Sequence, residues 1–199
     1  MTITVTEPSI IQDIFKISIL SVQLDLDVKS IETFCMKHKI SNDGRKRSNI
    51  GGYQSNALDI GDKYLKPLVK EINKHSKIMT EQYAIDKECY YIDMWFNING
   101  NKDYNIPHNH PESIFSGVYY VKTLPDCGNI VFEHPALDVI AYAHFNLKFN
   151  EWNSRNTHTW WHPAQENMMY IFPSWLKHCV EPNLSPENRI SISFNCIGQ

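Results

Sequence analysis

Two patterns of apolar residues divide the chain near residue 88. Before that point, apolar side chains recur three and four positions apart, which is typical of amphipathic helices. Five of them form one stripe on a helix that we expect to begin at Asp59 and to pack on a sheet: Leu65, Leu68, Val69, Ile72 and Met79. The sequence therefore predicts a mostly helical N-terminal support over residues 1–87.

Local signals complete the expectations for this N-terminal part. Residues 14–24 are typical of a strand. Asp25 or Asp27 is placed to cap a helix that runs to about Lys39. Residues 40–56 are polar and contain glycine, which indicates a loop between the two predicted helices.

From about residue 88 the apolar period changes to two, as in half-buried strands. The first of these strands places four apolar residues on one face: Ile92, Met94, Phe96 and Ile98. Turn residues separate the further predicted strands, which span residues 116–122, 128–132, 168–172 and 189–195. Many short strands after helices favour a mainly β sandwich or barrel, as one domain over residues 1–199, with supporting helices on one outer face.

Residues 134–166 are the least regular part of the predicted β region. They carry Trp152, Trp160 and Trp161 together with four histidines. A loop of this length inside a compact domain is more often functional than idle, so we expect a lid or substrate-selecting insertion. Trp160 and Trp161 either form an aromatic wall there or are buried packing residues.

Composition and charge exclude several classes of protein. The 199 residues are 42% apolar, and no apolar run approaches the length of a membrane helix. The N-terminus lacks the pattern of a secretory signal, so we expect a cytoplasmic protein. A net charge of -3 excludes a domain-wide basic field for nucleic acid. We interpret the one basic cluster, Arg45-Lys46-Arg47, as a solvated loop.

The histidines are unusually clustered, since seven of the nine lie between residues 108 and 178. His108 and His110 are spaced so that both side chains leave the same side of an extended segment, where two imidazoles can chelate one metal ion. Alone, this motif fits two surface histidines equally well. His178 follows a strand end and a turn at Pro173, which is a natural way to deliver a third ligand; the alternative is a lone core histidine.

The last predicted strand alternates strictly. Ile190, Ile192 and Phe194 form one layer, while Arg189 and Ser191 lead the opposite face. If that face lines a barrel, the Arg189 guanidinium and the Ser191 hydroxyl could together bind a carboxylate, because arginine offers paired hydrogen-bond donors. The alternative is an edge strand with one solvated polar face.

Taken together, these strings resemble the iron(II)/2-oxoglutarate-dependent oxygenases, and most closely a group found in bacteria and marine phages. The matching segments are His108-Asn109-His110-Pro111, Ser116 to Val121, Gly128 to Phe132, Phe172 to Asn183 and Arg189 to Asn195. The resemblance is strong over residues 88–199 and loose before them. It implies a double-stranded β-helix, the cupin-like jelly roll, over residues 88–199, with residues 134–166 as the lid.

The resemblance also implies roles for individual residues. His108, His110 and His178 match the Fe(II) ligands, and Arg189 matches the residue that pairs with the far carboxylate of 2-oxoglutarate. Ser191 lies beside Arg189, and Asn97 and Tyr120 are further candidates for holding this co-substrate. The implied reaction couples oxidative decarboxylation of 2-oxoglutarate to succinate with O2-dependent oxidation of a substrate C–H bond, most simply a hydroxylation.

One position departs from the wider family, in which the second ligand is a carboxylate. Here it is His110, so two ligand sets remain open. Either His108, His110 and His178 bind the iron, or Glu112 takes the place of His110 as a ligand and His110 does not contact the metal ion directly. A neutral three-histidine set leaves more positive charge on Fe(II), which favours tight binding of an anionic co-substrate.

Two other functions remain as alternatives. One is a three-histidine cupin-like metalloenzyme that does not use 2-oxoglutarate, and the other is a non-catalytic metal-binding module. The expected partner is a small-molecule or protein side-chain substrate rather than nucleic acid or membrane, with a homodimer as the default assembly. A phage-encoded protein would act in the host cytoplasm.

Overall fold

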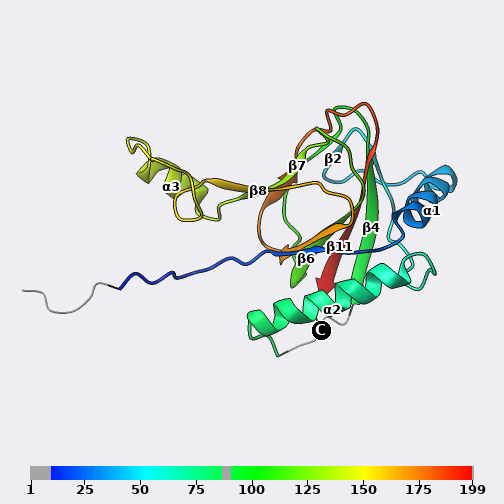
Figure 1. The fold of residues 1–199 in the computed structure, drawn as a ribbon, viewed down its shortest axis with the longest axis horizontal. Helices are drawn as coiled ribbons and strands as arrows, with labels where there is room; N and C mark the ends of the chain where they lie inside the picture. Colours follow the sequence, from blue (N-terminus) through cyan, green and yellow to red (C-terminus); the bar gives the residue numbers. More distant parts are fainter. Residues whose placement is uncertain (1–9, 87–90, 199) are drawn as a thin grey trace, which may run out of the picture.

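Two antiparallel sheets form the body of the protein in a computed structural model that describes residues 10–86 and 91–198. The six-stranded sheet has the order β1 (Leu20–Gln23), β9 (Met168–Pro173), β6 (Phe115–Lys122), β11 (Arg189–Ile197), β4 (Tyr91–Asn99) and β3 (Tyr53–Gln54). The five-stranded sheet has the order β2 (Asn49–Ile50), β5 (Tyr104–His108), β10 (His178–Val180), β7 (Asn129–Glu133) and β8 (Thr159–Pro163). The mainly β jelly roll expected from the sequence is therefore the observed architecture (Figure 1).

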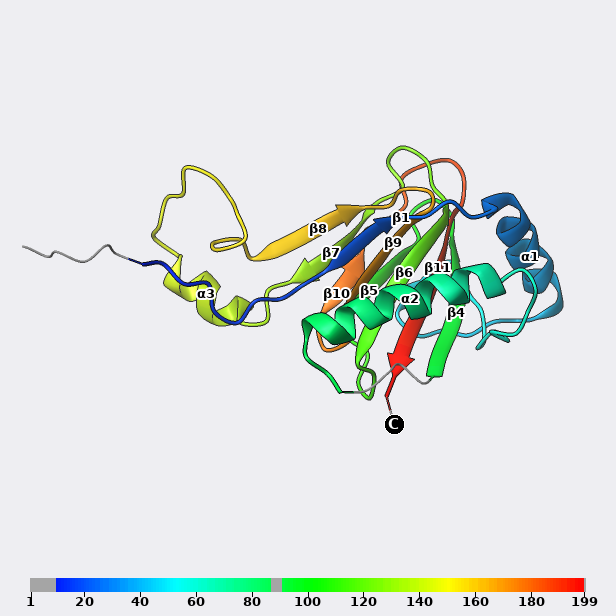
Figure 2. The ribbon, with the colours of Figure 1, turned by 60° about the horizontal axis from the view of Figure 1, so that its bottom comes forward.

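The outer face of the six-stranded sheet carries the larger apolar core. Helices α1 (Val28–Ser41) and α2 (Lys66–Gln82) pack on this face (Figure 2). They contribute Ile31, Leu68 and Ile72 to a buried cluster that also contains Ile192 and Phe194 of β11. The predicted alternation of β4 and β11 is confirmed, because their apolar residues fill this cluster and their polar residues face the other sheet.

A smaller apolar cluster lies between the two sheets. It joins Val118 and Tyr120 of β6 to Ile130 and Phe132 of β7, with Phe172 of β9 beside them. This inner cluster fills only part of the space between the sheets. Polar side chains from β4, β5 and β11 line the remainder, and that remainder is where the candidate site lies.

The N-terminal part contains less helix than the sequence suggests, since β1, β2 and β3 also belong to it. Only Leu20–Gln23 of the predicted 14–24 strand pairs, with β9 as its neighbour. Residues 40–56 are not simply a loop, because Asn49 pairs with Asn105 and Gln54 pairs with Asn97. These pairings join residues that are more than 40 positions apart, which local turn signals do not reveal.

The helix ends follow local chemistry. Asp27 is the cap of α1, where its carboxylate accepts a hydrogen bond of 3.1 Å from the backbone N–H of Ser30. Helix α2 begins at Lys66 rather than at Asp59. The carboxylates of Asp59 and Asp62 instead accept hydrogen bonds from backbone N–H groups two residues ahead and hold turns before the helix.

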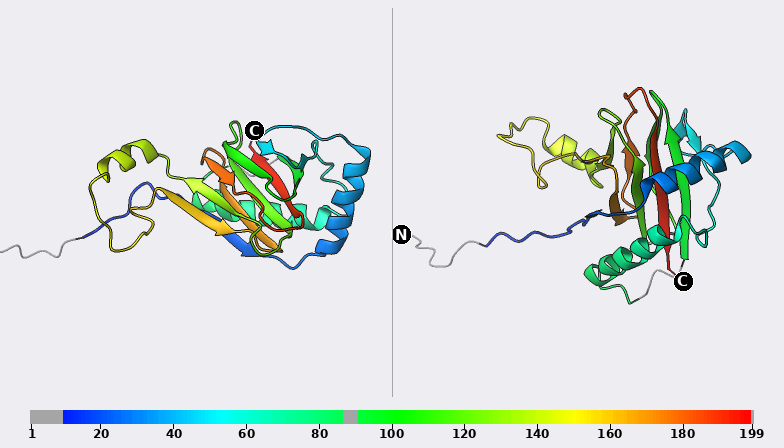
Figure 3. Two further views of the ribbon diagram at one scale, coloured as in Figure 1. Left: turned by 90° about the horizontal axis from the view of Figure 1, so that it is seen from above. Right: turned by 45° about the vertical axis from the view of Figure 1, so that its right-hand side comes forward.

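The predicted insertion leaves the barrel. Helix α3 (Leu137–Ala143) and the residues that follow it up to β8 project away from both sheets (Figure 3), and residues 10–19 contact this projecting part. Arg155 of the insertion makes an ion pair of 2.7 Å with Asp13 of that chain. Within the described part of the chain, no helix is long and apolar enough to cross a membrane.

Candidate metal centre

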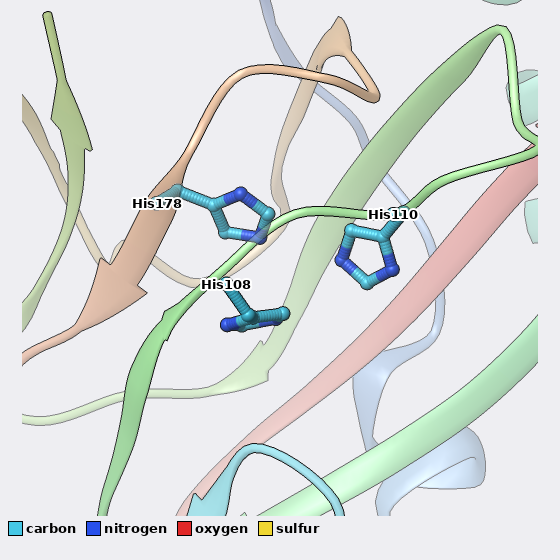
Figure 4. Close-up of side chains that lie close together, drawn as sticks. All are labelled: His108, His110 and His178. Atoms are coloured by element: carbon cyan, nitrogen blue, oxygen red, sulfur yellow. The ribbon is translucent and has the colours of Figure 1, made fainter. Parts of the chain in front are cut away.

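Three histidines from two strands and one loop meet at one end of the space between the sheets (Figure 4). His108 ends β5 and His178 begins β10, and the two residues are directly paired in the sheet. His110 follows two residues after His108, where its backbone N–H donates to the Ser174 carbonyl at 3.0 Å. One ligand atom from each residue lies within 4.8 Å of the others, close enough to bind one metal ion.

Backbone carbonyls fix the orientation of two of these rings. His108 Nδ1 lies 2.7 Å from the Ile106 carbonyl oxygen, and His178 Nδ1 lies 2.9 Å from that of Leu176. A carbonyl oxygen only accepts, so each Nδ1 carries the proton and donates. Each Nε2 is then left with a free lone pair, which is the arrangement usual for metal-binding histidines.

Burial favours the neutral form of all three rings. It lowers the pKa of His108, lowers that of His110 to about 4 and lowers that of His178 to about 3. The neighbouring imidazoles act in the same direction on His110 and His178. Near pH 7 the three rings are therefore neutral, the form that a metal ion requires.

Glu112 does not join this cluster. It is exposed, and its backbone adopts a φ of 72° in the turn after Pro111. The three histidines form the group with metal-binding spacing within the described chain, and no carboxylate belongs to it. The geometry thus favours the three-histidine set over the alternative in which Glu112 replaces His110.

Polar residues predicted from the sequence line the cavity behind the histidines. Ser191 of β11 lies between Asn97 of β4 and Tyr120 of β6, which are its neighbours in the sheet. Asn97 donates a hydrogen bond of 3.2 Å to Ser193 Oγ. Asn97 Oδ1 and the Tyr120 hydroxyl are buried and have no hydrogen-bond partner among the residues that the structure describes. Unpaired buried polar atoms are costly, so this cavity is suited to a polar ligand.

Arg189 lies two residues before Ser191 on the same face of β11 and is 1% exposed. Its Nη1 donates to the carbonyl oxygens of Cys127 and Glu181. Its Nε and Nη2 are buried without a partner among residues 10–86 and 91–198, and no carboxylate of those residues forms an ion pair with it. Burial lowers the pKa of this guanidinium, and the nearby Tyr120 acts in the opposite direction. A buried cation of this kind requires an anionic partner.

Sequence reasoning missed several residues of this centre. Trp95 and Asn105 line the cavity together with Ser193. The Trp95 ring lies 5.6 Å from the His110 ring, measured between ring centroids, and is tilted by 38° to it. The alternation of β11 could have identified Ser193, which shares a face with Arg189 and Ser191. No pattern in the sequence identifies Trp95, because this apolar residue lies on the face of β4 opposite to the apolar residues that signal the strand.

The insertion shapes a second cavity of about 340 Å³. Its walls come from the insertion and β8, from Ile17 and Ile19, and from Phe132, whose main chain pairs with His178. Trp160 and Trp161 lie on β8 and are 46% and 60% exposed. They are therefore not the buried packing residues that were one interpretation of the sequence, and Trp160 forms part of this cavity's wall.

Comparisons with known proteins agree on one family. A family model described as “Putative 2OG-Fe(II) oxygenase” matches residues 93–195, just over half of the chain. A prolyl-4-hydroxylase from Pseudomonas putida superimposes with a TM-score of 0.66 at 11% identity, over 91% of this chain and 92% of its own. A comparison with curated proteins finds no significant match.

Two further solved structures share the fold. A viral collagen prolyl hydroxylase from Paramecium Bursaria Chlorella virus-1, in complex with 2-oxoglutarate, gives a TM-score of 0.56 at 11% identity and covers 89% of this chain and 94% of its own. HygX from Streptomyces hygroscopicus, with nickel and 2-oxoglutarate bound, gives 0.58 at 9% identity and covers 89% and 81%. At such low identities these similarities describe the fold alone.

Proposed function

Because this chain belongs to the family of 2-oxoglutarate- and Fe(II)-dependent oxygenases, we propose that it is a hydroxylase in which three histidines hold the iron. As a member of that family it is an enzyme that uses Fe(II), 2-oxoglutarate and O2. In the proposal, His108, His110 and His178 bind the metal ion. Arg189 binds the distal carboxylate of 2-oxoglutarate.

The observation that carries this proposal is the unpaired side of Arg189. Its Nε and Nη2 present two parallel donors, the geometry that matches a carboxylate. The Cys127 and Glu181 carbonyls hold the other side of the guanidinium and so fix its direction. A cupin-like metalloenzyme without 2-oxoglutarate has no use for a buried, unpaired cation on the strand that lines its metal cavity.

When bound, Fe(II) and 2-oxoglutarate supply an oxidative decarboxylation that yields succinate and carbon dioxide and places one oxygen atom of O2 in a substrate C–H bond. The chain's own residues orient these groups and limit the access of water. Phe172 packs 4.7 Å from the His178 ring and Phe132 packs 6.1 Å from it, measured between centroids. These rings shield the metal ligand deepest in the protein.

Three residues complete the proposed co-substrate site. The Tyr120 hydroxyl is free to donate to a carboxylate oxygen, and burial raises its pKa, so it keeps this proton. Ser191 and Asn97 offer a hydroxyl and an amide on the same wall of the cavity. They fit the positions at which hydrogen bonds would hold the co-substrate between Arg189 and the metal.

The substrate and its surroundings remain proposals. The structural neighbours include a prolyl hydroxylase solved with a peptide fragment, and we propose a small molecule or a protein side chain as the substrate class here. The insertion over residues 134–166, with its own cavity, is our candidate for the substrate-selecting element. The expected homodimer, the cytoplasmic location and a phage origin stay predictions.

An anaerobic titration tests the proposal. The purified chain is titrated with Fe(II) and then with 2-oxoglutarate while the visible absorbance is recorded. We expect a charge-transfer band to appear when 2-oxoglutarate is added. Arg189→Gln should bind the metal ion normally and give no band at the same concentration of 2-oxoglutarate.

Arg155→Gln is the matched control, because that arginine is paired with Asp13 on the surface and lies outside the cavity. It should behave as the unaltered chain. Since Arg189 is buried, Arg189→Lys is measured as well, and circular dichroism checks that each variant is folded. A normal band in the folded Arg189→Gln variant would remove Arg189 from the co-substrate site.

A further inference from the structure

We propose that the substrate carries a carboxylate or phosphate group, which Arg45 receives in a basic groove on the outer side of the metal centre. This inference rests on the proposed function, because it concerns the second ligand of the same centre. Its evidence is separate, however. It comes from Arg45, which precedes β2, and from its neighbours, and not from the unpaired donors of Arg189.

The groove lies against two of the three metal-binding histidines. Arg45, Lys46 and Arg47 line it together with His108 and His110. His108 and His110 also line the inner cavity, whereas His178 lines the inner cavity alone. Two cavities thus adjoin the metal centre: the inner cavity, where we propose that 2-oxoglutarate binds, and the groove.

Main-chain pairing and stacking hold Arg45 in place. Its backbone N–H donates to the Gln54 carbonyl at 2.8 Å, an isolated bridge next to β3. Its guanidinium lies over the Trp95 ring at 5.5 Å, and the Trp95 ring in turn contacts the His110 ring in a tilted arrangement. Such a cation–π contact orients an arginine without neutralising it. Arg45 is therefore preorganised beside a metal-binding histidine.

The charge of Arg45 is not balanced. Its Nε is shielded from solvent and has no hydrogen-bond partner among the described residues. Arg189 is the other arginine with a buried, unpaired Nε, whereas Arg155 uses its Nε to bind Asp13. This parallel suggests that Arg45, like Arg189, is shaped for an anion that arrives with a ligand.

The charged residues around Arg45 make the electrostatic potential of the groove positive. Three cationic side chains line it against one carboxylate, that of Asp93. Across residues 10–86 and 91–198, none of these three cations forms an ion pair, although other lysines and arginines on the surface do. The whole chain has a net charge of -3, so this positive patch is local. A local patch beside the metal suits a small anionic group better than a nucleic-acid backbone.

The arginine side chains themselves provide the test, because the chain has only four: Arg45, Arg47, Arg155 and Arg189. The full chain is labelled with nitrogen-15 and loaded with Zn(II), which avoids the broadening that Fe(II) causes. The Nε–H signals are recorded during titrations with 2-oxoglutarate and then, at saturating 2-oxoglutarate, with inorganic phosphate or acetate. Arg45→Lys, Arg47→Lys and Arg155→Lys assign the signals.

The expected result separates the two proposals in one set of spectra. 2-Oxoglutarate should shift the Arg189 signal, and phosphate or acetate should then shift the Arg45 signal in a saturable way. Arg45→Gln should weaken anion binding, followed through the Arg47 signal, at least about tenfold, as expected for loss of a charge-assisted hydrogen bond. Arg155→Lys is the matched control and should leave the anion affinity unchanged.

Two results overturn the inference. In the first, Arg189 responds to 2-oxoglutarate while Arg45 responds to neither anion; the proposed function then stands and the anion site does not. In the second, a 12-base-pair DNA duplex shifts the Arg45 signal at concentrations where phosphate and acetate do not, which would identify a nucleic-acid surface instead. Failure of Arg189 to respond to 2-oxoglutarate counts against the proposed function, and the Arg45 response is scored independently.

Discussion

The two faces of the six-stranded sheet are made by alternate residues of the same strands, yet they differ in how completely their polar groups are paired. On the outer face, the Tyr119 hydroxyl donates to Asn167 Oδ1 at 2.6 Å. On the inner face, the hydroxyl of the next residue, Tyr120, has no partner within the described chain. The Tyr119 hydroxyl is paired within the protein, whereas the inner face keeps unpaired groups that our proposal assigns to ligands. We therefore expect that changes on the two faces of one strand separate stability from ligand binding.

The largest expected effect tests the outer face. Phe194 is fully buried between β11 and the helices, so Phe194→Ala should lower the free energy of unfolding by about 3–5 kcal/mol. Urea unfolding measures this loss. Leu184→Ala is the control, because Leu184 is 64% exposed and its truncation should change stability by less than about 0.5 kcal/mol. Metal binding by the folded fraction of Phe194→Ala should be unchanged, and a parallel loss of metal would mean that the two faces are coupled.

The second prediction tests the inner face through its metal ion. A metal ion at 100 times its dissociation constant should stabilise the unaltered chain by about 2.7 kcal/mol. His178→Ala should abolish this gain, since it removes one of three ligands. Thermal unfolding with and without metal measures the difference. His134→Ala, which changes a histidine outside the cluster, should keep the full gain. A stabilised His178→Ala variant would exclude His178 as a ligand.

A third and smaller effect compares neighbouring tyrosines directly. Tyr119→Phe removes a paired hydroxyl and should cost about 1 kcal/mol of stability. Tyr120→Phe removes an unpaired one and should leave stability unchanged or slightly higher, while it weakens 2-oxoglutarate binding. Urea unfolding gives the free energy of unfolding of each variant, and the 2-oxoglutarate titration gives its affinity for 2-oxoglutarate. Equal stability losses would show that the Tyr120 hydroxyl is satisfied in solution and would remove the contrast.

The smallest effect concerns a helix that covers the outer face. Hydrogen bonds from Ser30 hold the pKa of Asp27 below its ordinary value, so the cap stabilises α1 when the carboxylate is charged. This contribution is fully present above the unfolded pKa of about 3.9 and is lost as the pH falls through the lower folded pKa. The difference in unfolding midpoint between the unaltered chain and Asp27→Ala should shrink from pH 6 to pH 3. A constant difference would point to a cause other than the charge.

Much of the inner face could be predicted from the sequence because strand alternation is local. The order Arg189-Ile190-Ser191-Ile192 assigns each residue to a face once the strand is recognised, and the structure agrees. The convergence of His108, His110 and His178 depends on the pairing of β5 with β10, which spacing alone does not give. There the resemblance to a family supplied what periodicity could not.

Arg45 shows where sequence reasoning stopped. A polar, glycine-containing segment favours a loop, and a basic cluster in a loop is most simply solvated. The structure instead pairs this segment with β4 and β5 and places Arg45 over Trp95. These contacts join residues about 50 positions apart, and no local pattern encodes them. The short segments β2 and β3 could not be recognised for the same reason, since two residues carry no periodicity.

The position of β11 has a consequence for how the chain folds. It is the last strand in sequence order among those described, yet it lies in the middle of the six-stranded sheet, between β6 and β4. During synthesis β6 and β4 emerge from the ribosome before β11. Until β11 is made, the strand edges that it will pair with stay unpaired and are prone to aggregation. Closing the sheet joins residues about 100 positions apart, so we expect slow folding. Because Arg189 begins β11, the insertion of this strand also brings the Arg189 guanidinium into the protein. The sheet and the proposed carboxylate site are therefore completed in the same step.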